Sequence, residues 1–143
     1  MSYSKDDLLF APLGGSGEIG MNVNLYHFRD SWIMVDLGIS FPDESTPGVD
    51  IILPDLKFIA DRREKLAGLV LTHAHEDHFG AIPYLWSQIG CPIYGTAFTI
   101  ALLRRKLSES RVALDIPLHE IGMNAPFNLG SFEIEMVALN HSI

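Results

Sequence analysis

Hydrophobic residues along the chain alternate with polar residues or form short runs, which is typical of β-strands separated by turns. The early segments that predict strands are 8–13, 22–28, 32–36 and 67–72. The residues between the second and third segments, 29–31, are polar and predict a turn. We therefore expect residues 22–36 to form a hairpin.

Helical spacing of apolar residues appears later in the chain and is mixed with further strand signals. It predicts helices over residues 56–65, from Ile82 onward, and over residues 97–108. Asp55 or a neighbour is expected to cap the first helix and Thr96 the last, and Pro83 is tolerated in a first turn. The further segments that predict strands are 92–95, 111–114 and 131–139. This order of elements predicts an α/β layered domain.

The glycine-rich segment 15–20 matches the pattern G-x-G-x-x-G, which raises the alternative of a dinucleotide site. Asp36 even lies at about the spacing of the ribose-binding acid. That site needs a helix directly after the glycines, whereas residues 22–28 alternate like a strand. We therefore favour a tight loop close to the polar cluster described below.

Length, composition and charge define the class of protein. A chain of 143 residues with 48% hydrophobic residues suits one folded domain. The net charge of −8 argues against a surface that coats nucleic acid, but it does not exclude an enzyme that acts on nucleic acid. The basic clusters 62–63 and 104–106 are expected to be solvated helix faces, with phosphate contact as the less favoured alternative.

The sequence also indicates a compartment. No apolar run approaches the roughly 20 residues of a membrane span, and the first residues lack the form of a signal peptide. The single cysteine, Cys91, excludes an internal disulfide. We expect a cytoplasmic location without membrane association, and Cys91 as a core residue.

The segment with the clearest chemistry follows the predicted strand 67–72. It holds His73, His75, Asp77 and His78 within six residues. Residues two apart on an extended chain point the same way, so the first two histidines can bind one ion and the last two residues a second ion. The alternative is a solvated histidine-rich loop. Glu76 points the other way, and a solvated or salt-bridged role is expected for it.

Three motifs in order give the chain a resemblance to a known family. They are PLGGSGEIGMN at 12–22, LTHAHEDHFGAIPY at 71–84 and NHSI at 140–143. With Asp36 at the end of a preceding strand, they closely resemble the metallo-β-lactamase superfamily and, within it, the ribonuclease J family. The resemblance covers essentially the whole chain.

The resemblance implies a set of site residues. His73, His75 and His141 would bind one divalent ion, whereas Asp77 and His78 would bind the second and take part in catalysis. His141 would follow the predicted strand 131–139. The resemblance also places Asp36 beneath the site, where it fixes a ligand or the loop. The remaining histidines, His27 and His119, match no ligand position and are expected to be surface or partly buried residues.

The donor atoms are nitrogen and oxygen, which suit two zinc ions and also manganese. The resemblance implies a metal-dependent ribonuclease of RNA processing and decay, with 5′-to-3′ exonuclease and endonuclease action on RNA. A small-molecule metallo-hydrolase of the same superfamily and a non-catalytic scaffold remain as alternatives.

The family fold is an αββα sandwich, and residues 1–143 would form only its first half. They would be the N-terminal part of a metallo-β-lactamase-like domain, without the β-CASP and C-terminal domains. We therefore expect the isolated chain to have a weak, incomplete metal site and no useful turnover of RNA. We also expect exposed apolar surface that favours a homo-oligomer.

Overall fold

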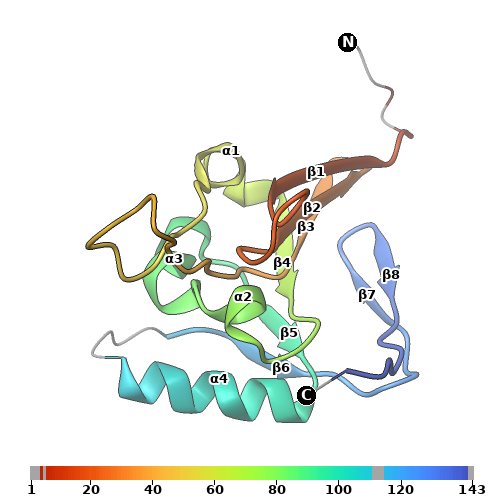
Figure 1. Cartoon of the computed structure of the whole chain (residues 1–143). Helices are drawn as coiled ribbons and strands as arrows, with labels where there is room; N and C mark the ends of the chain where they lie inside the picture. Colours follow the sequence, from red (N-terminus) through yellow and green to blue (C-terminus); the bar gives the residue numbers. More distant parts are fainter. Residues whose placement is uncertain (1–3, 5, 111–114, 142–143) are drawn as a thin grey trace.

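A six-stranded sheet forms the centre of the computed structural model, which describes residues 4, 6–110 and 115–141 (Figure 1). The strands lie in the order of the sequence; the first two neighbouring pairs are antiparallel and the other three pairs are parallel. They are β1 (Leu9–Gly14), β2 (Val23–Phe28), β3 (Ser31–Val35), β4 (Leu66–Val70), β5 (Ile93–Gly95) and β6 (Leu118–Glu120).

The hairpin predicted over residues 22–36 is confirmed. Its two-residue turn, Arg29 and Asp30, has φ angles of 47° and 62°, which matches the turn type that best joins twisted antiparallel strands. All residues from 15 to 28 are described, and none of them is helical. The chain therefore lacks the helix on which the dinucleotide alternative depends.

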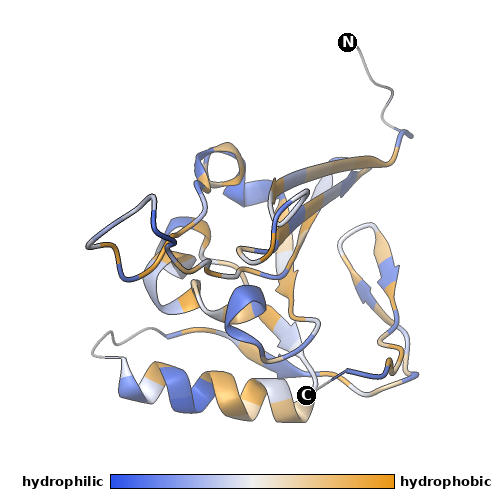
Figure 2. Ribbon diagram, in the orientation of Figure 1, coloured by the Kyte–Doolittle hydropathy of each residue, from blue (hydrophilic) through white to orange (hydrophobic). Residues whose placement is uncertain are grey.

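Helices cover one face of the sheet (Figure 1). They are α1 (Lys57–Ala60), a 3₁₀ turn (Arg63–Lys65), α2 (Glu76–Phe79), α3 (Ile82–Ile89) and α4 (Ala97–Glu109). The main core lies between these helices and the sheet, where Leu25, Met34 and Leu69 are fully buried. Figure 2 shows hydrophobic colouring along the inner strands and hydrophilic colouring on α2.

The opposite face of the sheet carries a smaller apolar cluster. Ile33, Val70 and Leu129 are its buried members. A hairpin of β7 (Phe127–Leu129) and β8 (Phe132–Ile134) packs against it. Helices, sheet and hairpin thus form layers, which confirms the α/β class and fits part of a sandwich with two sheets.

The predicted helix 56–65 is wrong in its length. Asp55 Oδ1 accepts a hydrogen bond from Lys57 N at 2.8 Å, as expected near a helix start, although Leu56 is the N-cap residue. The α-helix then ends at Ala60 and a 3₁₀ turn follows. The 3₁₀ turn buries no side chain, so no core packing supports a longer helix. The other two helices agree with prediction, with Pro83 in the first turn of α3 and Thr96 capping α4.

The predicted strand 131–139 is also too long. Its described counterpart, β8, is only three residues long and pairs over its full length with the equally short β7. Met136 then forms an isolated bridge with Met123. The strand predicted at 111–114 lies outside the described residues. No helix in the described ranges is long and apolar enough to cross a membrane.

Candidate metal centre

The ends of two parallel strands bring the first site residues together. Asp36 follows β3 and Thr72 follows β4, whose register pairs Val35 with Val70. Thr72 donates hydrogen bonds to the Asp36 carboxylate from its backbone N at 2.8 Å and from Oγ1 at 2.8 Å. The carboxyl ends of neighbouring parallel strands are the usual place for a site in such sheets.

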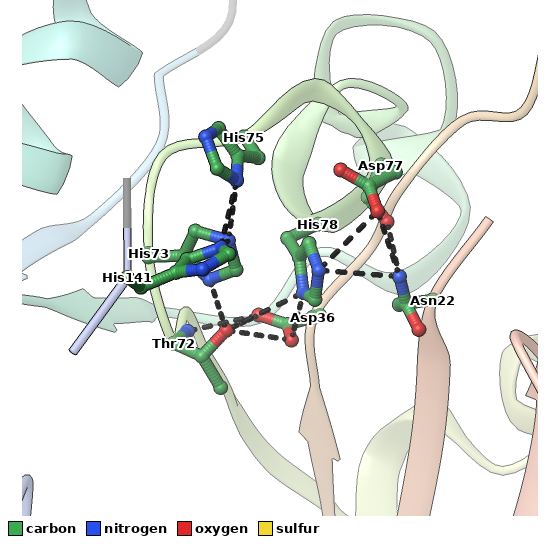
Figure 3. Close-up of polar contacts among 8 residues, drawn as sticks. All are labelled: Asn22, Asp36, Thr72, His73, His75, Asp77, His78 and His141. Atoms are coloured by element: carbon green, nitrogen blue, oxygen red, sulfur yellow. Dashed lines mark hydrogen bonds and ion pairs between the residues drawn. The ribbon is translucent and has the colours of Figure 1, made fainter. Parts of the chain in front are cut away.

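Three imidazole nitrogens converge beside this junction (Figure 3). His73 Nε2 lies 2.9 Å from His75 Nδ1, and His141 Nε2 lies 3.1 Å from each of these atoms. Ala74, between the first two histidines, is buried on the other side. The alternation that the sequence predicts therefore brings His73 and His75 to the same point.

His141 reaches this point from far along the chain. It lies on the irregular segment after β8, so the strand expected to carry it there ends earlier than predicted. Its ring still packs edge-on against those of His73 and His75, with centroids 4.7 and 4.8 Å apart. The position that the resemblance implies is therefore compatible with the structure.

The geometry of the three nitrogens fits a divalent cation. A tetrahedral zinc ion with bonds of about 2.0–2.1 Å separates its ligand nitrogens by about 3.3–3.4 Å. The observed separations of 2.9–3.1 Å are slightly smaller, so a small outward movement of the rings would admit an ion. Three ring nitrogens this close cannot all donate to one another, whereas a shared cation satisfies all three lone pairs.

The protonation of His73 suits this role. Because Thr72 Oγ1 donates to Asp36, it can accept from His73 Nδ1 at 2.9 Å, which leaves the lone pair of Nε2 facing the other histidines. Burial and the neighbouring imidazoles lower the pKa of His73, although Asp36 acts in the opposite direction. The lowered pKa favours the neutral ring, which is the form that binds a metal.

His78 and Asp77 form a second group next to the three histidines. His78 Nδ1 donates to Asp36 Oδ2 at 2.7 Å, and its Nε2 lies 3.4 Å from Asp77 Oδ2. Burial lowers the pKa of His78, but the hydrogen bond and charge of Asp36, together with Asp77, raise it overall. The rings of His73 and His78 have centroids only 4.0 Å apart, so the two groups are adjacent.

Backbone hydrogen bonds hold the short helix that carries these ligands. The carbonyls of Glu76, Asp77 and His78 accept from the backbone N–H groups of Ile39, Asn22 and Leu37 at 3.1, 2.9 and 2.7 Å, respectively. A four-residue helix has little stability of its own, so these bonds fix its position. A Cβ at Gly38 would collide with the Asp77 carbonyl, which makes glycine necessary there.

Glu76 points away from the ligands, as expected. Both of its carboxylate oxygens accept from Lys106 Nζ, at 2.9 and 2.8 Å. This ion pair ties α4 to α2. The predicted salt-bridged role of Glu76 is therefore confirmed.

The remaining histidines and the cysteine are not part of the ligand cluster. His27 is buried against Trp32, with ring centroids 4.6 Å apart, so its expected exposure is wrong: it belongs to the packed face of the hairpin. His119 is exposed and stacks on Tyr94. Cys91 is buried in the main core, as expected, and burial raises the pKa of its thiol to about 12.

The basic clusters are largely solvated, as expected. Arg62 and Arg63 are exposed beside α1, and Arg104 and Arg105 are exposed on α4. Lys106 is the exception because it is partly buried by its contact with Glu76. Sequence reasoning missed this contact, and it also missed Thr72 and Asn22. Their positions in the sequence could have indicated both residues, because Thr72 adjoins the histidine motif and Asn22 ends the glycine-rich motif.

The sequence of the chain matches those of known proteins. A family model described as the metallo-beta-lactamase superfamily matches residues 18–138. A ribonuclease J of Sinorhizobium meliloti is 43% identical over 142 residues, which cover 96% of this chain and 25% of the relative. A ribonuclease J of Mycolicibacterium smegmatis is 46% identical over 132 residues, covering 92% and 23%. The chain thus spans about a quarter of the length of the curated relatives that it matches.

Solved structures show the same fold at low sequence identity. The metallo-beta-lactamase fold protein YhfI from Bacillus subtilis superposes with a TM-score of 0.64 and 18% identity, over 94% of this chain and 53% of that protein. A protein of unknown function from Enterococcus faecalis gives a TM-score of 0.67 and 21% identity, over 94% and 38%. The described sheet and helices therefore correspond to part of a larger domain in these proteins.

Proposed function

Because the chain belongs to the metallo-beta-lactamase superfamily, we propose that the clustered histidines form one half of a centre for two divalent ions. The observation that carries this proposal is the triangle of nitrogens from His73, His75 and His141, with sides of 2.9–3.1 Å. Asp77 and His78 would hold the second ion beside it. Asp36 would orient the ligands through direct and Thr72-mediated hydrogen bonds.

We propose zinc as the more suitable metal, with manganese as the alternative. The ligand set consists of imidazole nitrogens and a carboxylate, which both metals accept. A thiolate is not available to the centre, because the single cysteine is buried in the core with a pKa of about 12. Metal analysis after purification, followed by re-addition of zinc or manganese to chelator-treated protein, tests the choice.

The reaction that we propose is hydrolysis of RNA phosphodiesters, with 5′-to-3′ exonuclease and endonuclease action. The support is the 37–46% identity to proteins named ribonuclease J. The solved structures named above share only the fold, so they do not favour a small-molecule substrate. A cavity of about 670 Å³ beside His73 and His141, lined in part by Phe98 and Met136, offers space next to the centre.

The ions and the residues around them would have separate roles in the hydrolysis. When bound, the two cations would lower the pKa of a water molecule and neutralise charge on the phosphodiester. Asp77 and His78 would hold their ion against the histidine triangle and so fix where the substrate phosphate lies. Asp36, buried beneath them, would keep His78 in the tautomer whose Nε2 faces the centre.

We propose that residues 1–143 are the N-terminal part of a metallo-β-lactamase-like domain within a longer ribonuclease. Alone, they should bind metal weakly and cleave little RNA, since the chain spans about a quarter of its relatives. The test replaces the matching segment of the Sinorhizobium meliloti relative by this chain. RNA cleavage by the chimera, and its loss in the His73→Ala variant, is expected. A folded, metal-loaded chimera without cleavage would contradict the ribonuclease proposal.

We also propose that the isolated chain forms homo-oligomers. Large apolar side chains are exposed on several elements, among them Phe10, Phe98 and Leu139. Light scattering should show a mass above 15.9 kDa that increases with concentration. A monodisperse monomer contradicts this proposal. A cytoplasmic location is proposed from the unpaired cysteine and is tested by cell fractionation.

A further inference from the structure

Asn22 lies at the point where the glycine-rich loop meets the proposed metal ligands (Figure 3). Its side-chain Nδ2 lies 3.2 Å from Asp77 Oδ2 and 3.2 Å from His78 Nε2. It also lies 3.1 Å from the backbone carbonyl of Asp77. One amide nitrogen thus touches both side chains that would bind the second ion.

The chemistry of these contacts defines their direction. The Asp77 carboxylate oxygen is an acceptor, so the 3.2 Å contact with it is an N–H donation from Asn22 to Asp77. The neutral His78 ring that would bind an ion donates from Nδ1 to Asp36 and has a single lone pair on Nε2, which the ion would take in place of the Asn22 N–H. Asn22 therefore orients the Asp77 carboxylate, which keeps further lone pairs for the ion, beside His78 Nε2.

Backbone hydrogen bonds also fix the position of Asn22. Its N–H donates to the Asp77 carbonyl at 2.9 Å, and its carbonyl accepts from Gly38 N at 3.0 Å. Gly15, with φ of 81°, leaves room for the amide oxygen, since a Cβ there would lie 2.5 Å from Asn22 Oδ1. The glycine-rich loop thereby holds Asn22 against the helix that carries Asp77 and His78.

We propose that Asn22 is a positioning residue that sets the affinity of the Asp77–His78 half of the centre for its divalent cation. The histidine triangle does not depend on it. This inference rests on the proposed two-ion centre but not on the identity of the substrate. Loss of a residue that holds a metal ligand without binding the metal itself typically lowers the metal affinity by about 10–100-fold.

Two substitutions at this position separate positioning from general support of the fold. Asn22→Ala removes the donor that orients the Asp77 carboxylate, so the second ion should bind about 10–100-fold more weakly while the first ion binds as in the original protein. Asn22→Asp has the same shape but places a carboxylate beside Asp77. It should bind the second ion more tightly than Asn22→Ala, because a cation between the carboxylates relieves their repulsion.

The experiment is calorimetric titration, with zinc and then with manganese, of the chelator-treated chimera proposed above, in its original form, in both Asn22 variants and in a matched control. Asn128→Ala is the control, because Asn128 is an exposed residue of β7. Circular dichroism verifies folding. If Asn22→Ala is unfolded, the second-ion affinity of Asn22→Asp is compared with that of the original protein instead. A selective change in the second ion supports the inference. Equal second-ion affinities in all four proteins, or an original protein without a second ion, overturn it.

RNA cleavage is not part of this measurement, so the two proposals can fail separately. A protein that shows the expected ion affinities but cleaves no RNA in the chimera contradicts the ribonuclease proposal and leaves the role of Asn22 intact. A chimera that cleaves RNA but binds the second ion equally well with and without Asn22 contradicts the role of Asn22 and leaves the ribonuclease proposal intact.

Discussion

Asp36 Oδ2 accepts a hydrogen bond from His78 Nδ1 at 2.7 Å, across 42 residues of sequence. The same carboxylate accepts from both donors of Thr72, which in turn contacts His73. Asp36 is only 3% exposed and has a φ of 64°, a conformation that asparagine and aspartate tolerate better than most residues. One buried side chain thus orients ligands in both halves of the centre.

Asp36→Asn should lower the affinity of the protein for divalent ions by about 10–100-fold. Asparagine tolerates the left-handed backbone, so the change removes the charge and one acceptor without forcing the chain to move. His78 then loses the anionic partner that fixes its tautomer. Calorimetric titration with zinc measures the effect. Asp50→Asn, in an exposed loop, is the matched control, and an equal affinity in both variants would contradict the role of Asp36.

Gly38→Ala should destabilise the protein and weaken metal binding together. The added Cβ collides with the Asp77 carbonyl, and this overpacking costs about 1–3 kcal/mol. Chemical denaturation gives the free energy of unfolding, and titration gives the ion affinity. Gly122→Ala is the control, because its Cβ would meet only Ala125 Cβ at 3.4 Å. A Gly38→Ala protein as stable as that control would refute the close approach.

The Glu76–Lys106 ion pair should contribute more than an exposed pair on the same helix. Its side chains are 43% and 25% exposed, whereas those of Arg105 and Glu109 are 75% and 64% exposed. Exposed pairs of this spacing contribute about 0.3–0.5 kcal/mol. Double-mutant cycles with Glu76→Gln and Lys106→Met, and with the corresponding changes in the control pair, measure both couplings. Equal coupling energies for the two pairs would contradict the prediction that the Glu76–Lys106 pair contributes more to stability.

The buried thiol of Cys91 should make stability fall in alkaline solution. Its pKa is about 12 in the folded protein, against about 8.5 in an unfolded chain, so the folded state holds the proton more tightly. Stability is therefore lost as the pH rises from about 8.5 toward 12, by up to about 1.4 kcal/mol per pH unit from this group. Denaturation curves between pH 8 and 10 should decline more steeply than those of Cys91→Ala. Parallel declines would contradict the prediction.

Local patterns predicted those parts of the fold that depend on neighbouring residues. The two-residue turn at Arg29 and Asp30, the cap at Thr96 and the alternation of His73, Ala74 and His75 are all local, and the structure agrees. The lengths of α1 and β8 depend instead on burial and on the length of a partner strand. Sequence periodicity contains neither quantity, so both elements were predicted too long.

The same distinction applies to the candidate site. The histidine motif identifies its own ligands, and the resemblance supplied His141 and Asp36. Asn22 and Lys106 could not be found in this way, because their contacts with residues 76–78 join positions at least 30 residues apart. Only the packing of the glycine-rich loop and of α4 against α2 reveals them.

X-ray absorption spectroscopy of the zinc-loaded protein tests the central claim, that the histidine cluster is a divalent metal centre, most directly. The account predicts several nitrogen or oxygen neighbours at about 2.0–2.1 Å, with the scattering pattern of imidazole rings and no sulfur at about 2.3 Å. That imidazole signal should weaken in the His73→Ala and His141→Ala variants. Sulfur coordination, or a zinc environment unchanged by both substitutions, would contradict the account.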